Sequence, residues 1–128
     1  MKIINNNPYR QLGVYSTSTQ KEVVANQGKM KAFLKVGRQV SFPLDLNGLL
    51  PDVLRTEQSV ADATSKLSLP TEQLKYAQFW FSKTTQLDEI ACGKLTNGDL
   101  DGAIEIWNKK SSASSLQNLL VCALIKNL

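Results

Sequence analysis

Apolar residues along the chain recur at the spacing of α-helices, and no stretch alternates between apolar and polar residues as a strand would. The sequence Thr19-Gln20-Lys21-Glu22 has the form of a capping box, which predicts a helix start. Gly37 predicts its end. The helix between them has apolar residues on one side, namely Val23, Met30, Phe33 and Leu34. The pattern therefore predicts an all-α fold.

Prolines and glycines divide the remaining chain into shorter elements. Pro43 predicts a loop over residues 39–51, because proline cannot continue a helix, and Pro70 favours a first helical position. Residues 1–18 are expected to be irregular around a small apolar cluster of Tyr9, Leu12, Val14 and Tyr15. We expect the later helices at residues 52–67, 70–82, 86–96, 99–110 and 114–127.

Composition narrows the possible chemistry. The chain has 128 residues, enough for one domain or for one small domain with part of another. With 42% hydrophobic and 20% charged residues, its composition is typical of a soluble globular protein. It contains no histidine, which excludes Ser-His-Asp and Cys-His nucleophile pairs and histidine metal ligands. Cys92 and Cys122 are too few for a zinc site, and we expect both to be free buried thiols. We expect no enzyme activity, no metal and no cofactor.

The net charge of +4 is concentrated in one segment. Residues 21–38 contain five basic residues and one acidic residue, and the rest of the chain carries ten of each sign. Lys31, Lys35 and Arg38 follow the spacing i, i+4, i+7, which predicts a basic stripe on one side of the helix. The stripe is either a solvated helix face or a docking face for an acidic surface.

The segment Tyr9-Arg10-Gln11-Leu12-Gly13-Val14 resembles the YxxLGV opening of J-domains, the DnaJ-like co-chaperone module. The following order is also similar: a basic amphipathic helix, a loop with proline and aspartate, a second long helix and a short helix with aromatic residues. The similarity covers roughly residues 5–82. It implies that residues 1–83 form a J-domain-like helical hairpin domain whose partner is a heat-shock chaperone ATPase.

The loop departs from the J-domain pattern. J-domains trigger ATP hydrolysis in their partner through a His-Pro-Asp tripeptide, whereas this chain has Phe42-Pro43-Leu44-Asp45. The trigger therefore does not carry over, and we do not expect stimulation of the chaperone ATPase. The resemblance leaves Lys31, Lys35 and Arg38 as a docking face, with Pro43 and Asp45 shaping the adjoining loop.

Residues 95–110 resemble the middle of a tetratricopeptide repeat, so residues 84–128 are expected to form tetratricopeptide-like helices. A Gly-Asp turn at Gly98 precedes a helix in which Ala103 is followed four residues later by Trp107. A small residue at a close helix crossing with a large one beside it is the packing such repeats need. The last helix contains the apolar run Leu119–Ile125, which must pack inside the domain, on a further segment or against a partner.

The sequence therefore predicts a non-enzymatic protein–protein interaction module, either a chaperone-associated adaptor or the N-terminal part of a larger scaffold. Nucleic-acid binding through residues 21–38 is one alternative, although phosphate recognition needs more cations. A structural segment of a longer helical-repeat protein is the other. The longest apolar run has seven residues, too few to span a bilayer, and the free thiols favour the cytoplasm. Of Phe79-Trp80-Phe81, we expect two side chains to be buried and one to face another element or a partner.

Overall fold

Helices joined by turns and one long loop make up the protein in the computed structural model, which describes residues 1–127. No β-strand forms within this range, so the all-α prediction is confirmed. In chain order the helices are α1 (Lys2–Asn5), α2 (Pro8–Gln11), α3 (Gln20–Lys35), the 3₁₀ helix η1 (Pro43–Asp45), α4 (Glu57–Lys66), α5 (Pro70–Ala77), α6 (Gln86–Thr96), α7 (Leu100–Trp107) and α8 (Ala113–Lys126).

Helix α3 begins and ends where the sequence predicts. The Thr19 hydroxyl accepts the Glu22 N–H at 3.2 Å, and the Glu22 carboxylate accepts the Thr19 N–H at 3.3 Å, which completes the capping box. At the other end Gly37 has a φ of 73°, and the Arg38 N–H donates to the Phe33 carbonyl at 3.0 Å. This is a Schellman turn, which favours glycine because its left-handed backbone disfavours side chains with a Cβ.

Helices α4, α5 and α7 are shorter than predicted. Helix α4 begins at Glu57 rather than at residue 52, because Thr56 caps it and Arg55 is drawn into the interior in front of it. Helix α5 ends at Ala77 instead of residue 82, and the aromatic residues that follow lie in the link to α6. Two of these, Trp80 and Phe81, are fully buried and Phe79 is half-buried against the same core. The expectation that two of the three aromatic side chains are buried is confirmed.

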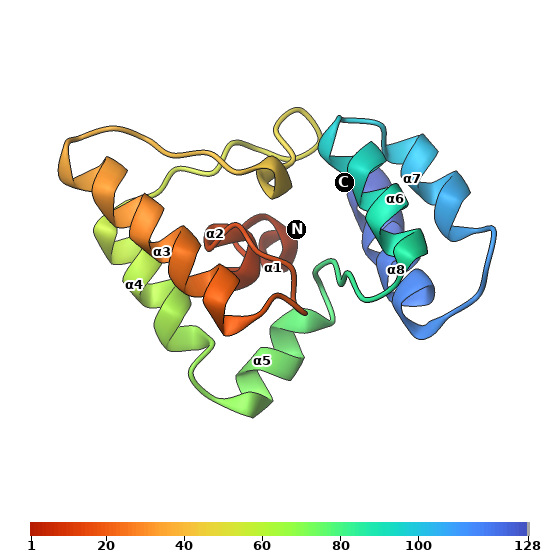
Figure 1. Cartoon of the computed structure of the whole chain (residues 1–128), viewed down its shortest axis with the longest axis horizontal. Helices are drawn as coiled ribbons and strands as arrows, with labels where there is room; N and C mark the ends of the chain where they lie inside the picture. Colours follow the sequence, from red (N-terminus) through yellow and green to blue (C-terminus); the bar gives the residue numbers. More distant parts are fainter. Residues whose placement is uncertain (128) are drawn as a thin grey trace.

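Helices α3 and α4 lie side by side and run in opposite directions (Figure 1). The Gln27 side-chain amide of α3 donates to the Thr64 hydroxyl of α4 at 3.0 Å. Seven residues further along α3, Leu34 lies beside Glu57 at the start of α4, as an antiparallel pair requires. Helix α2 packs against α4 and α5, so the N-terminal residues are enclosed by later helices. Among these residues Ile4, Tyr9, Leu12 and Val14 are buried.

Helices α6, α7 and α8 form a second group (Figure 1). Ala103 and Trp107 of α7 are both buried, as their spacing predicts. Helix α8 buries Val121, Cys122 and Ile125, whereas its Leu116 and Leu120 are 60% and 51% exposed. The apolar run of α8 therefore packs inside the protein on one side only.

Buried contacts join the two groups of helices. The Phe81 ring meets Trp80 edge-on, with 5.3 Å between ring centroids, and stacks on Trp107 of α7 at 6.0 Å. The Asn118 side chain of α8 accepts the Ser82 N–H and donates to the Ser82 carbonyl, both at 2.8 Å. The boundary expected between residues 83 and 84 lies in the extended link between α5 and α6, and one hydrophobic core extends across it.

Candidate partner-binding surface

The C-terminal half of α3 presents two free lysines to solvent. Helix α3 buries Met30 and half-buries Val23, Phe33 and Leu34, whereas Lys31 and Lys35 are exposed one turn apart. Neither ammonium group forms an ion pair within residues 1–127. These lysines are therefore available to carboxylates or phosphates of another molecule.

Arg38 does not continue this pair of lysines. The helix ends at Lys35, and after the turn at Gly37 the Arg38 guanidinium lies 5.9 Å from the centre of the Phe33 ring. The Lys29 ammonium lies over the same ring at 5.9 Å and over the Phe42 ring at 5.1 Å. Lys29 and Lys31 are two positions apart, which places them about 200° apart around a helix. The predicted single stripe is thus two pairs of cations on different sides of α3.

Pro43 and Asp45 lie in η1, within the long loop between α3 and α4. Pro43 is exposed, whereas Asp45 is only 2% exposed. The Asp45 carboxylate accepts the Phe42 N–H at 3.1 Å and two N–H groups of Arg55 at 2.8 and 2.6 Å. Because all of these bonds lie inside the protein, the Asp45 carboxylate is not presented to a partner. Asp45 contributes to this surface by holding the loop between α3 and α4 in place.

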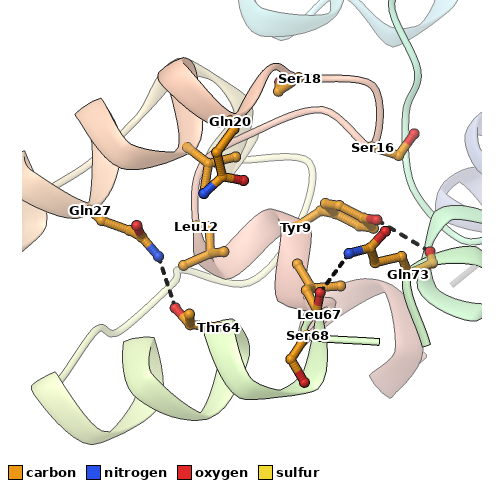
Figure 2. A pocket seen from close by; sticks show the side chains of 11 residues that line it. Tyr9, Leu12, Ser16, Ser18, Gln20, Gln27, Thr64, Leu67, Ser68 and Gln73 are labelled. Carbon is orange, nitrogen blue, oxygen red and sulfur yellow. Dashed lines mark hydrogen bonds between the residues drawn. The ribbon is translucent and has the colours of Figure 1, made fainter. Parts of the chain in front are cut away.

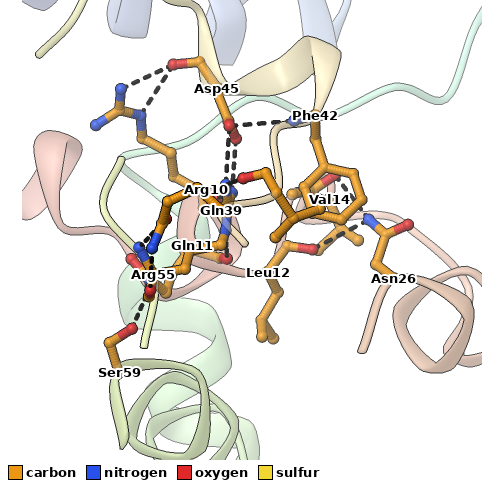
Figure 3. Close-up of polar contacts among 12 residues, drawn as sticks. Arg10, Gln11, Leu12, Val14, Asn26, Gln39, Phe42, Asp45, Arg55 and Ser59 are labelled. Atoms are coloured by element: carbon orange, nitrogen blue, oxygen red, sulfur yellow. Dashed lines mark hydrogen bonds and ion pairs between the residues drawn. The ribbon is translucent and has the colours of Figure 1, made fainter. Parts of the chain in front are cut away.

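Arg10 and Arg55, which the sequence reasoning did not single out, complete a buried polar network around Asp45 (Figure 3). The Arg55 guanidinium also donates to the carbonyls of Gln11, Val40 and Arg10 at 2.7–3.0 Å. The Arg10 guanidinium donates to carbonyls of the segments before and after it, namely those of Asn5, Asp45 and Pro51. Burial lowers the pKa of Arg10, and the charge of Asp45 opposes this change. The network fixes the loop that follows the lysines.

A groove of about 380 Å³ lies between α3 and α4. Leu34, Val60 and Ala61 give it an apolar surface, Gln27 lies at one end, and Lys31 and Glu57 lie on opposite sides. The Leu34 and Val60 side chains are half-buried, so part of each remains accessible to solvent. The groove adjoins the exposed lysines and belongs to the same surface.

A second hollow, of about 440 Å³, is enclosed by α2, α3, α4 and α5 (Figure 2). Its apolar lining comes from Leu12, Val23 and Leu67, and the Tyr9 hydroxyl donates to the Gln73 backbone carbonyl at 3.2 Å. Its other side chains are hydroxyls and amides without formal charge: Ser16, Ser18, Gln20, Gln27, Thr64, Ser68 and Gln73. Two of these amides already bond within the protein, Gln27 to Thr64 and Gln73 to the Leu67 carbonyl.

The side chains that could ligate a metal are dispersed, and both cysteines are buried, in the described part of the chain. No group of three or more Asp, Glu, Cys or His side chains there could hold a metal ion. Burial raises the pKa of the Cys92 thiol to about 11 and that of the Cys122 thiol to about 12. Both cysteines are free and buried, as predicted. Within residues 1–127, no helix combines the length and the apolar character needed to cross a bilayer.

Comparison with protein-family models, with curated proteins and with solved structures finds no match for this chain. The similarities to J-domains and to tetratricopeptide repeats therefore rest on the sequence motifs alone. Any function of the lysine surface has to be argued from the residues themselves.

Proposed function

We propose that this chain is a non-enzymatic adaptor that docks on an acidic protein surface through Lys31 and Lys35. The observation that supports this function best is the pair of exposed lysines, one turn apart and without an internal ion-pair partner. The segment that contains them accounts for the entire net positive charge of the chain. A local positive field of this kind steers an acidic partner to one face and favours one orientation.

The partner we propose is a heat-shock chaperone ATPase, on the basis of the J-domain-like motif at Tyr9–Val14. The chain has Phe42 at the place of the trigger histidine, and the Asp45 carboxylate is occupied by Arg55. The adaptor would therefore recruit the chaperone, or compete for it, without accelerating ATP hydrolysis.

The first prediction concerns the double substitution Lys31→Glu/Lys35→Glu. Binding to the chaperone ATPase of the source cell should weaken by about tenfold or more, since each surface charge pair contributes up to about 1 kcal/mol and reversal adds repulsion. Fluorescence anisotropy with the labelled full chain at two salt concentrations measures this change. The matched control is Lys109→Glu/Lys110→Glu, two exposed lysines in the turn between α7 and α8.

Three results would contradict the proposal. The first is no saturable binding at micromolar concentration, and the second is equal affinity of both double variants. The third is binding of a single-stranded oligonucleotide in place of the chaperone, which would favour nucleic-acid recognition instead. Stimulation of ATP hydrolysis by the unmodified chain would contradict the non-stimulating role.

A further inference from the structure

The groove between α3 and α4 has charges of opposite sign on its two sides. Lys31 lies on the α3 side, with Lys35 one turn further on, and Glu57 lies on the α4 side. Lys29 and Arg38 lie at the Phe33 ring on another side of α3, so the positive charge on this flank comes from Lys31 and Lys35. A molecule lying along this groove therefore meets positive charge on one flank and a carboxylate on the other.

The lining residues of the groove extend along two turns of α3. Gln27 and Leu34 are seven residues apart on α3, a distance of about 10 Å along the helix axis. Two apolar side chains at positions i and i+7 of a bound helix are separated by the same distance along its axis. Leu34, Val60 and Ala61 supply the apolar contact between these ends.

We infer that this groove binds an acidic amphipathic helix of the partner protein, with its apolar face on Leu34 and Val60. Carboxylates on one flank of the helix lie over Lys31 and Lys35, and the flank over Glu57 carries no acidic residue. The inference rests on the proposed function, because it uses the same lysines, and adds the apolar anchor and the orientation of the bound segment.

The test uses two designed helical peptides with the same leucine face, one with glutamates on the flanking positions and one with lysines there. Fluorescence anisotropy measures their binding to the full chain. The substitution Ala61→Phe fills the groove from an exposed position on α4 without changing any charge. Ala32→Phe, at an exposed position of α3 outside the groove, is the matched control. Far-UV circular dichroism checks that both variants remain folded.

We expect the glutamate peptide to bind saturably and the lysine peptide to bind at least tenfold more weakly. Ala61→Phe should weaken binding of the glutamate peptide at least tenfold, whereas Ala32→Phe should leave it unchanged. No binding, or equal binding of both peptides, overturns the inference. If Lys31→Glu/Lys35→Glu weakens chaperone binding but Ala61→Phe leaves peptide binding unchanged, the groove is excluded and the proposed function stands. If Ala61→Phe weakens peptide binding but Lys31→Glu/Lys35→Glu leaves chaperone binding unchanged, the lysines are not a docking site. The acidic character inferred for the bound helix is then also wrong.

Discussion

At the residue scale, three buried charges hold the loop between α3 and α4 in place. The guanidinium of Arg55 meets both carboxylate oxygens of Asp45, and its other N–H groups reach backbone carbonyls. Only the planar fork of arginine can serve a carboxylate and several carbonyls at once, whereas a lysine offers a single point charge. Arg10 adds a second guanidinium, whose N–H groups are accepted by carbonyls instead.

Replacing Arg55 by Leu should lower the free energy of unfolding by about 3–5 kcal/mol, because the Asp45 carboxylate would remain buried without its partner. Urea unfolding followed by circular dichroism measures the loss. The comparison is Lys126→Ala, which removes the exposed ion pair with Asp101 and should cost less than about 1 kcal/mol. Similar losses in the two variants would show that the buried network is not what stabilises the loop.

The sequence predicts which apolar residues are buried far better than it predicts these charges. The periodicity of α3 predicts an apolar side of Val23, Met30, Phe33 and Leu34, of which Met30 is buried and the other three are half-buried. The spacing in α7 predicts the burial of Ala103 and Trp107, which is confirmed. The residues next to Arg55 in the sequence do not distinguish it from a solvent-exposed arginine. Its burial follows from contacts with residues 10, 11, 40 and 45, which only the folded chain brings together. Arg38 departs from the predicted stripe for a local reason, because α3 ends at Lys35 and the turn at Gly37 brings Arg38 to the Phe33 ring.

At the scale of elements, capping residues decide how accurately a helix can be placed. Helices α3 and α6 carry clear signals at both ends, and the structure agrees closely with the expected limits. Helix α4 was expected to include residues 52–56, but the burial of Arg55 keeps this segment extended. A local pattern cannot reveal that a distant residue draws the chain inward.

Asp88 links α6 to α7 and gives this group of helices a pH dependence. Its carboxylate accepts the N–H groups of Thr84 and Thr85 at 2.9 and 3.1 Å and the Trp107 indole N–H at 2.9 Å. Burial alone would raise the pKa of Asp88, but these donors together with Ser114 favour the carboxylate, and the pKa lies below its usual value.

A carboxyl whose pKa is lower in the folded than in the unfolded state stabilises the fold above the unfolded value, near 3.9, and loses this contribution as pH falls through the folded value. We therefore expect the free energy of unfolding to decrease on acidification from about pH 5. In Asp88→Asn this decrease should be smaller, and stability at pH 7 should be lower, as measured by urea unfolding at several pH values. An unchanged pH profile in the variant would exclude Asp88 as its source.

At the scale of the whole molecule, the shared core predicts that the two groups of helices unfold together. Trp80 lies in the link after α5 and Trp107 in α7, with Phe81 between them. Thermal unfolding should give the same midpoint by tryptophan fluorescence and by far-UV circular dichroism, as a two-state transition requires.

Phe81→Ala opens a cavity at this junction and should cost about 3–5 kcal/mol of stability. If the groups are coupled through Phe81, the variant unfolds either in one transition at lower temperature or in two separate ones. The control is Phe79→Ala, in which a half-buried ring of the same link is removed. Two transitions in the unmodified protein would contradict the shared core.

The two buried thiols also have a kinetic consequence. Cys92 lies in α6 and Cys122 in α8, and at neutral pH their raised pKa values keep both protonated. Because only an exposed thiolate reacts readily with an alkylating reagent, modification has to wait until the surrounding helices separate. The labelling rate of each cysteine therefore reports how often the helices around it separate, whether by local opening or by unfolding of the whole protein.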